Sequence, residues 1–308
     1  MSLTRIPFTV PSEYDELTLH GLIIRPEGRI EGIVQIVHGM CDHKERYIDF
    51  MEYLSEHGYL TVIHDMRGHG ESVKEPGDLG YFYGGGADAA IRDVESVRAY
   101  VEEGVHEELP YILIGNSLGS LVVRGYIQHR DEHIDKLVLL GCPTPRPTLA
   151  AQKGSVRMLM KMKGDRAKSK TCDNILNMAL EKPFASEGRA HAWISTDTDV
   201  VDAFNEDPLC NFTYTLNGYD SLIALFDRTY DRKRFKPDHT DLPIFILAGS
   251  DDPCIGSRKD YGKSVHFIKK LGYTDVKAGL YAGMRHDLLH ETKKQKVYRD
   301  ILDFIEER

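Results

Sequence analysis

Five short runs of apolar, mostly β-branched residues recur along the chain, and most are apolar throughout instead of alternating with polar residues. They are Gly32–Val37, Tyr59–His64, Tyr111–Ile114, Lys136–Leu140 and Leu242–Ala248. Such runs are typical of strands buried on both faces, as in a parallel sheet covered by helices. Segments with helical spacing of apolar residues lie between them, at Tyr47–His57, Ala87–Glu103 and Leu118–His129. The alternation predicts an α/β fold with a mostly parallel central sheet and helices on both faces.

The two ends of this pattern differ from its middle. Phe8–Val10 and Leu17–Ile24 predict an antiparallel hairpin that precedes the parallel strands. After Cys142 three prolines interrupt the alternation, and the stretch that follows contains helical patches such as Ser155–Met162 and Asp173–Leu180. We therefore expect a core formed by residues 1–143 and 237–308, with residues 144–236 inserted as a helical cap.

Composition limits the partners and the compartment. The 308 residues include 39 basic and 48 acidic side chains, a net charge of −9, which is a poor electrostatic match for nucleic acid. Five scattered cysteines without a C-x-x-C pair favour a reducing compartment. No signal-peptide core is present, and no run approaches the roughly 18 apolar residues that span a bilayer. We expect a cytoplasmic protein with no nucleic-acid partner and no integral membrane span. A transient lipid contact through the cap stays open, and no feature predicts an oligomeric state.

The run that starts at Tyr111 leads directly into Gly115-Asn116-Ser117-Leu118-Gly119, a G-x-S-x-G motif, and a helical segment follows it. A serine on a sharp turn between strand and helix holds its hydroxyl clear of the sheet, and the flanking glycines avoid collisions with neighbouring backbone. The amino end of the helix directs its dipole and free N–H groups to the same place. Ser117 is therefore the predicted nucleophile; the alternative is an ordinary glycine-bounded turn with an incidental serine.

A serine hydroxyl needs a base to take its proton and an acid to orient that base. In proteins with this type of turn, the acid and then the histidine come later in the chain. Asp251 and Asp252 both follow the Leu242–Ala248 run, and we prefer Asp252 because Gly-x-x-Asp is the usual spacing. His286 follows the predicted strand Lys277–Tyr281 and is the candidate base, with His290 as its competitor.

Acyl transfer also needs two N–H donors where negative charge develops. Leu118, directly after the nucleophile, is predicted to supply one of them. His38 and Gly39 end an early strand, so the N–H of Met40 is the predicted second donor, with Gly39 allowing close approach of the backbone. A plain strand-ending glycine is the alternative interpretation.

These motifs together resemble the α/β-hydrolase superfamily, and within it the monoglyceride lipase, lysophospholipase and serine aminopeptidase-like branch. His38–Tyr47 is similar to the H-G-x-x-E-H-x-x-R-Y stretch of that branch, and Asp65–Ser72 to its D-x-R-G-H-G-x-S stretch. Asp207-Pro208-Leu209 resembles an element of its cap, and Gly249–Asp252 and Arg285–Asp287 resemble its acid and base loops. The branch usually has His before the nucleophile, Met after it and Glu after the base. Here Asn116, Leu118 and Asp287 take those places.

No cofactor or metal is predicted. Gly84-Gly85-Gly86 lacks the G-K-[ST] ending of a phosphate loop, and no H-E-x-x-H occurs. His129 and His133 have the spacing to hold a metal on one helix, but a solvated helix end explains them better. The methionine-rich stretch Val156–Met162 fits either an acyl groove or the packed face of a cap helix, and we favour the packed face.

The residues and the resemblance predict a serine hydrolase. Its substrate would be a small-molecule carboxylic ester of an apolar acyl group, like a monoacylglycerol or lysophospholipid, cleaved through an acyl-enzyme. One alternative is an aminopeptidase-type peptidase with the same triad, which needs a cap carboxylate to hold the substrate ammonium. Candidates for that carboxylate are Asp197, Asp199 and Asp202. The other alternative is a non-catalytic binding protein with the hydrolase fold.

Overall fold

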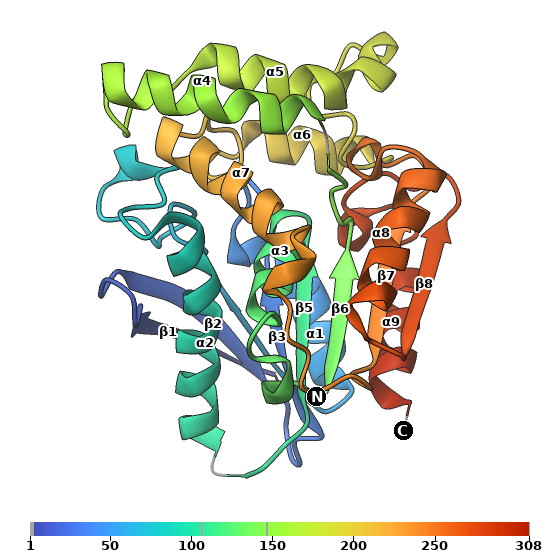
Figure 1. Cartoon of the computed structure of the whole chain (residues 1–308). Helices are drawn as coiled ribbons and strands as arrows, with labels where there is room; N and C mark the ends of the chain where they lie inside the picture. Colours follow the sequence, from blue (N-terminus) through green and yellow to red (C-terminus); the bar gives the residue numbers. More distant parts are fainter. Residues whose placement is uncertain (1–2, 106, 146, 308) are drawn as a thin grey trace.

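The computed structural model describes residues 3–105, 107–145 and 147–307. Its centre is an eight-stranded sheet of order β1-β2-β4-β3-β5-β6-β7-β8 (Figure 1). Strands β3 to β8 pair in parallel, whereas β2 runs antiparallel to both β1 and β4. The predicted parallel sheet and the antiparallel hairpin are therefore confirmed. The strands are β1 Thr4–Pro11, β2 Thr18–Arg25, β3 Gly32–Val37, β4 Tyr59–His64, β5 Tyr111–Asn116, β6 Lys136–Leu140, β7 Ile244–Gly249 and β8 Val276–Tyr281.

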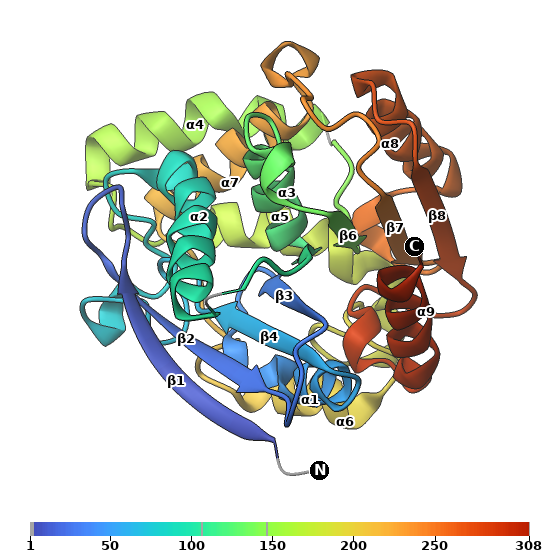
Figure 2. The ribbon, with the colours of Figure 1, turned by 90° about the horizontal axis from the view of Figure 1, so that it is seen from below.

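Helices cover both faces of this sheet. The α-helices are α1 Ile48–Glu56, α2 Gly86–Val105, α3 Leu118–Tyr126, α4 Pro147–Lys163, α5 Lys170–Glu181, α6 Thr198–Glu206, α7 Leu216–Thr229, α8 Arg258–Leu271 and α9 Lys294–Glu306. Short 3₁₀ helices are η1 Lys44–Tyr47, η2 Pro76–Asp78, η3 Asp131–His133, η4 Lys182–Glu187, η5 Arg232–Arg234, η6 Pro253–Ile255 and η7 Leu288–His290. Figure 2 shows α2, α3 and α8 on one side of the sheet and α1 and α9 on the other.

The central strands are buried on both faces, as their continuous apolar runs predict. In β5 the side chain of Leu113 packs in the layer shared with α2 and α3, whereas Ile112 and Ile114 pack in the layer shared with α1 and α9. Each of the strands β3, β4 and β5 has six residues, and all of them are buried. Alternate residues of one strand thus build two separate apolar layers, which fixes the sheet between its helices.

Several element boundaries differ from the sequence prediction. β7 begins at Ile244 rather than Leu242, because Pro243 has no N–H to donate to the sheet. The Tyr47–His57 segment is divided between η1 and α1. α3 ends at Tyr126, since the N–H groups of Gln128 and His129 bond to carbonyls only three residues back. His129 and His133 therefore do not share a helix, which removes the geometry considered for a metal pair.

Helices α4 to α7 lie between β6 and β7 in the chain. In Figure 1, α4, α5 and α6 lie across the carboxyl ends of the strands, and α7 runs from them down to α3. α7 packs against α2, α3 and α4. The two predicted helical patches fall within α4 and α5. Among the described residues, no helix has both the length and the apolarity needed to cross a bilayer.

Arg67 anchors the loop after β4, and its side chain is fully buried. Its Nε and Nη2 donate to the two carboxylate oxygens of Asp93 on α2 at 2.7 and 3.0 Å. Its Nη1 and Nη2 also donate to Asp15 Oδ2 and Ser12 Oγ in the turn between β1 and β2, each at 3.0 Å. This one guanidinium therefore joins the hairpin to the helix layer.

Arg67→Met should lower the free energy of unfolding by about 3–5 kcal/mol, because it leaves the buried Asp93 carboxylate without its cation. Urea unfolding followed by circular dichroism measures this change. Arg157→Met is the control, since Arg157 pairs with Asp220 on an exposed surface, and its midpoint should stay almost unchanged. Equal midpoints for the two variants would contradict the anchoring role.

Candidate active site

Ser117 lies on the turn between β5 and α3, with backbone angles φ 51° and ψ −115°. Positive φ strains a residue that has a Cβ, at a cost of about 1–3 kcal/mol that the surrounding structure must offset. The glycines on either side are required by close packing. A Cβ on Gly119 would lie 2.0 Å from the carbonyl oxygen of Val37, and one on Gly115 would lie 2.6 Å from a methyl of Val123. The local sequence thus permits the strained turn that exposes the serine hydroxyl.

The structure brings Ser117, His286 and Asp252 together. Nε2 of His286 lies 2.7 Å from Ser117 Oγ, and its Nδ1 lies 2.9 Å from Asp252 Oδ2. Asp252 directly precedes η6, and its Oδ1 accepts a hydrogen bond of 2.7 Å from the N–H of Cys254. Asp251, the other carboxylate considered, is exposed and accepts a hydrogen bond from Ser250 Oγ instead. The turn after β7 therefore directs Asp252 to the imidazole.

His286 is buried, and its ring packs against that of Trp193 with 5.0 Å between centroids. Burial by itself lowers the pKa of a histidine, but the charge of Asp252, together with Cys254, outweighs it. The pKa of His286 is therefore raised well above its ordinary value. An imidazole of this kind is a stronger base toward the Ser117 hydroxyl.

The two residues predicted as oxyanion donors lie beside Ser117. Leu118 is the first residue of α3. Its N–H is therefore one of the N–H groups at the amino end of the helix that have no partner within the helix. Met40 follows Gly39, and a Cβ added to Gly39 would lie 3.4 Å from the Ser117 Cβ. Cys41 has φ 51°, which turns the chain away directly after Met40. Met40, Ser117 and Leu118 all line the same cavity.

This cavity has a volume of about 200 Å³ and lies between the sheet edge and the inserted helices. Its apolar walls come from α3, α5 and α7 and include Leu121, Leu176, Leu180, Leu222 and Phe226. Trp193 also lines it, although the sequence analysis did not single this residue out. The site therefore offers a serine hydroxyl beside an apolar chamber.

The methionine-rich stretch of α4 contributes nothing to this cavity among the described residues. Val156 is buried, whereas Met158 and Met162 are 63% and 67% exposed. The acyl-groove interpretation of this stretch is therefore wrong for the structure described. The packed-face interpretation holds only for the Val156 side of the helix.

The cap carboxylates considered for an ammonium group lie elsewhere. Asp197 caps the amino end of α6 and Asp202 pairs with Arg189, and neither they nor Asp199 line the cavity. The carboxylates that do line it are Asp42, Asp173 and Asp287. Each of these three has a hydrogen-bond partner within the chain.

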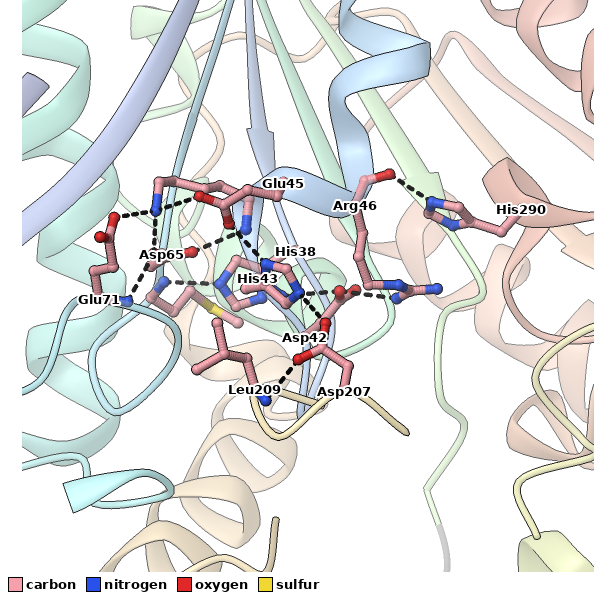
Figure 3. A network of polar contacts seen from close by, with 12 residues as sticks. His38, Asp42, His43, Glu45, Arg46, Asp65, Glu71, Asp207, Leu209 and His290 are labelled. Carbon is pink, nitrogen blue, oxygen red and sulfur yellow. Dashed lines mark hydrogen bonds and ion pairs between the residues drawn. The ribbon is translucent and has the colours of Figure 1, made fainter. Parts of the chain in front are cut away.

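Figure 3 shows the loop from His38 to Arg46 held in a network of polar contacts. His43 lies between two carboxylates, with Nδ1 2.7 Å from Glu45 and Nε2 2.9 Å from Asp207 in the inserted segment. Burial opposes the charge, but hydrogen bonds with Cys210, Glu45 and Asp207 raise the pKa of His43 to about 11. His43, Asp207 and Cys210 have the spacing of metal ligands, within 4.8 Å of one another. In the structure described, the carboxylates of Glu45 and Asp207 occupy both ring nitrogens of His43.

Comparison with known proteins places the chain in a family. The sequence model of the serine aminopeptidase S33 family matches residues 28–293. The chain belongs to this family. The relatives of this S33 chain include a monoacylglycerol lipase of Mycolicibacterium smegmatis, which is 24% identical over 292 residues that cover 91% of this chain and 90% of the relative. A monoglyceride lipase of Rattus norvegicus is 26% identical over 77% of this chain and 70% of its own length.

Solved structures agree on the fold of this S33 family member. A thermostable carboxyl esterase of Bacillus coagulans superposes with a TM-score of 0.87 at 23% identity, covering 99% of this chain and 98% of that one. A monoglyceride lipase of Saccharomyces cerevisiae gives 0.72 at 18% identity, covering 97% and 96%. The α/β-hydrolase fold and the resemblance to the monoglyceride lipase branch are confirmed.

Gly119→Ala should destabilise the protein by about 1–3 kcal/mol or more, because its new methyl group collides with the β3 backbone. Gly262→Ala is a matched control on α8, where an added Cβ meets nothing within 4 Å. That substitution should stabilise the protein by about 0.5–1 kcal/mol through helix propensity. Urea unfolding compares the two variants. A shift of both midpoints in the same direction would show that packing at the Ser117 turn does not limit the stability of the protein.

Proposed function

We propose that the protein is a carboxylic-ester hydrolase acting on small esters of apolar acyl groups, such as monoacylglycerols or lysophospholipids. The observation that carries this proposal is the hydrogen-bonded series from Ser117 Oγ through His286 to Asp252, at 2.7 and 2.9 Å, beside an apolar cavity. Relatives named as monoacylglycerol and monoglyceride lipases support the same substrate class.

In this mechanism Ser117 Oγ attacks the ester carbonyl carbon while His286 Nε2 takes the hydroxyl proton. The carbonyl π electrons move onto oxygen, where the N–H groups of Met40 and Leu118 stabilise the negative charge. The tetrahedral intermediate collapses, the bond to the alcohol breaks, and His286 returns the proton to the leaving oxygen. Water then attacks the acyl-enzyme with His286 as base, which releases the acid and restores Ser117. Asp252 holds the imidazole in the required tautomer throughout.

The inserted segment, proposed above as a cap over residues 144–236, supplies the substrate-facing walls in this scheme. Leu176 and Leu180 of α5 and Leu222 and Phe226 of α7 line the cavity. Apolar walls favour an acyl chain by roughly 0.8 kcal/mol for each buried methylene. We propose that this segment selects the acyl group, whereas the core residues carry out the chemistry.

An aminopeptidase activity is the second candidate, favoured by the description of the S33 family. Such an enzyme needs a carboxylate free to bind the substrate ammonium group. Asp42 and Asp287 in the cavity are already bonded to Arg46, and Asp173 accepts a hydrogen bond of 3.0 Å from the Tyr219 hydroxyl. Asp173 is bonded to a neutral hydroxyl and not to a cation, so it remains a candidate for holding the ammonium group. The apolar walls of the cavity are what favour the ester over the aminoacyl amide.

Purified protein should hydrolyse fatty-acid monoglycerides and p-nitrophenyl esters with a kcat/KM at least about 10³-fold above that for aminoacyl amides. Ser117→Ala should abolish both turnover and labelling by a fluorophosphonate probe, because no nucleophile remains. Ser55→Ala is the control, since Ser55 Oγ donates to the Ile24 carbonyl and does not line the cavity. Turnover that survives in Ser117→Ala would exclude Ser117 as the nucleophile. A wild-type protein that the probe fails to label would instead favour a non-catalytic role.

The pH profile should report the raised pKa of His286. Only neutral His286 accepts the serine proton, so kcat/KM rises with pH through this pKa, and the acid limb should lie above pH 6.5. Asp252→Asn removes the charge that raises the pKa, so the limb should move to lower pH while kcat falls by about 10⁴-fold. Asp251→Asn should leave both unchanged. If the acid limb of the pH profile is unshifted in Asp252→Asn, Asp252 is not the group that raises the pKa of His286.

A further inference from the structure

Among the four proposed catalytic loops, those of Met40 and Ser117 follow neighbouring strands, whereas that of His286 follows a strand far from β3. The loop of Met40 follows β3, and Ser117 follows β5, which pairs directly with β3. The loop of His286 follows β8, four strand positions from β3. That is about 19 Å at the usual strand spacing of about 4.8 Å. Any contact between the His286 loop and the Met40 loop must therefore be made by the loops themselves.

Arg46, which lies in η1 at the end of the Met40 loop, makes this contact. Its Nη1 donates to Asp42 Oδ1 and its Nη2 to Asp287 Oδ2, each at 2.8 Å. Asp287 directly follows His286 in the chain. The side chains of Arg46, Asp42 and Asp287 are only 14%, 4% and 5% exposed, so water competes weakly for these bonds. One guanidinium thus links the oxyanion loop to the loop of the base.

The same cluster reaches the nucleophile. Asp42 Oδ2 accepts a hydrogen bond of 2.8 Å from the Tyr47 hydroxyl, which in turn accepts one of 2.8 Å from Asn116 Nδ2. Asn116 immediately precedes Ser117. The N–H of Gly39, next to Met40, also donates to the Tyr47 hydroxyl, at 3.3 Å. A buried polar series therefore runs from the neighbour of the nucleophile to the neighbour of the base.

His290, the other candidate for the base, belongs to this link between the two loops. The polar contacts of its ring are with Arg46 and Asp287 instead of Ser117. Its Nε2 donates to the backbone carbonyl of Arg46 at 2.6 Å, and its Nδ1 lies 2.8 Å from Asp287 Oδ2. Burial works to raise the pKa of Asp287, but His290 and Arg46 outweigh it and hold that pKa well below the usual range. Asp287 is thus a carboxylate held between Arg46 and His290, directly beside His286.

We propose that Arg46 is a positioning residue for the ester hydrolysis: its guanidinium holds the His286 loop against the Met40 loop, which keeps the imidazole in reach of Ser117. Arg46 exchanges no proton in the reaction and acts through Asp287. This inference rests on the proposed function. A misplacement of about 1 Å can cost about 10²-fold in rate. Loss of the link therefore lowers kcat much more than it changes KM.

Arg46→Lys is the informative variant. Lysine keeps the positive charge between two buried carboxylates, but its ammonium cannot reproduce the planar fork that bonds both at once. Removing the charge altogether would leave both carboxylates unpaired and confuse positioning with stability. Arg98→Lys is the matched control, because Arg98 is also 14% exposed and pairs with two carboxylates, Glu95 and Glu102, on α2.

In Arg46→Lys we expect kcat and the rate of fluorophosphonate labelling to fall by about 10- to 100-fold, with KM changed by less than about 3-fold. The downfield proton resonance of the His286–Asp252 hydrogen bond should shift or broaden. Arg98→Lys should leave all of these readouts as in the wild type. Wild-type kcat in Arg46→Lys, or a loss of the same size in Arg98→Lys, would overturn the proposal.

Asp287→Ala supplies a second test that does not alter Arg46. It should lower kcat by about the same factor, and the double variant Arg46→Lys/Asp287→Ala should be no slower than the slower single variant, because both break one link. If the fold-losses of kcat in the two single variants multiply in the double variant, the proposal is overturned. If the wild type is labelled by the probe but hydrolyses no ester, the proposed substrate is wrong. The labelling rates of the variants then still decide the role of Arg46.

Discussion

Parallel pairing of β3 through β8 is the constraint on which the rest of the structure depends. Parallel strands end at the same edge of a sheet, so the loops after β3, β5, β7 and β8 meet there although they are distant in the chain. Each of these loops carries one residue of the proposed site: Met40, Ser117, Asp252 and His286 respectively. The inserted helices α4 to α6 lie across the same edge, so the cavity forms where the loops converge (Figure 1).

Convergence alone leaves errors of several ångströms, whereas proton transfer needs contacts of about 3 Å. Two different devices provide the finer placement. Ser117 is placed by its own strained backbone, which the flanking glycines permit. His286 is placed from outside its own loop, through Asp252 on one side and through its neighbour Asp287 on the other. Its loop is also bonded to the inserted segment, where the N–H of Asp287 donates to the Ile194 carbonyl at 2.8 Å.

The sheet and the sharp turn at Ser117 could be predicted from the sequence because both depend on local patterns. A run such as Gly32–Val37 is apolar throughout only where both faces are covered, and a strand followed by G-x-S-x-G has few other uses. The choice between Asp251 and Asp252 depends on which way one turn faces the loop after β8, and spacing alone could only favour one. Trp193 carried no signal at all, since its place beside His286 depends on how the inserted segment folds back.

Burying charge beside the site is expensive, and the arrangement shows how that cost is limited. Asp42 and Asp287 are nearly inaccessible, yet each shares the Arg46 guanidinium, and His290 approaches Asp287 from the other side. The position before the nucleophile contributes to the same cluster, because Asn116 donates its amide to Tyr47. Its Oδ1 is buried and has no partner within the described chain, a cost of about 1–3 kcal/mol. Asn116 therefore holds the turn at Ser117 through its bond with Tyr47, and this bond outweighs the cost of leaving its own oxygen unpaired.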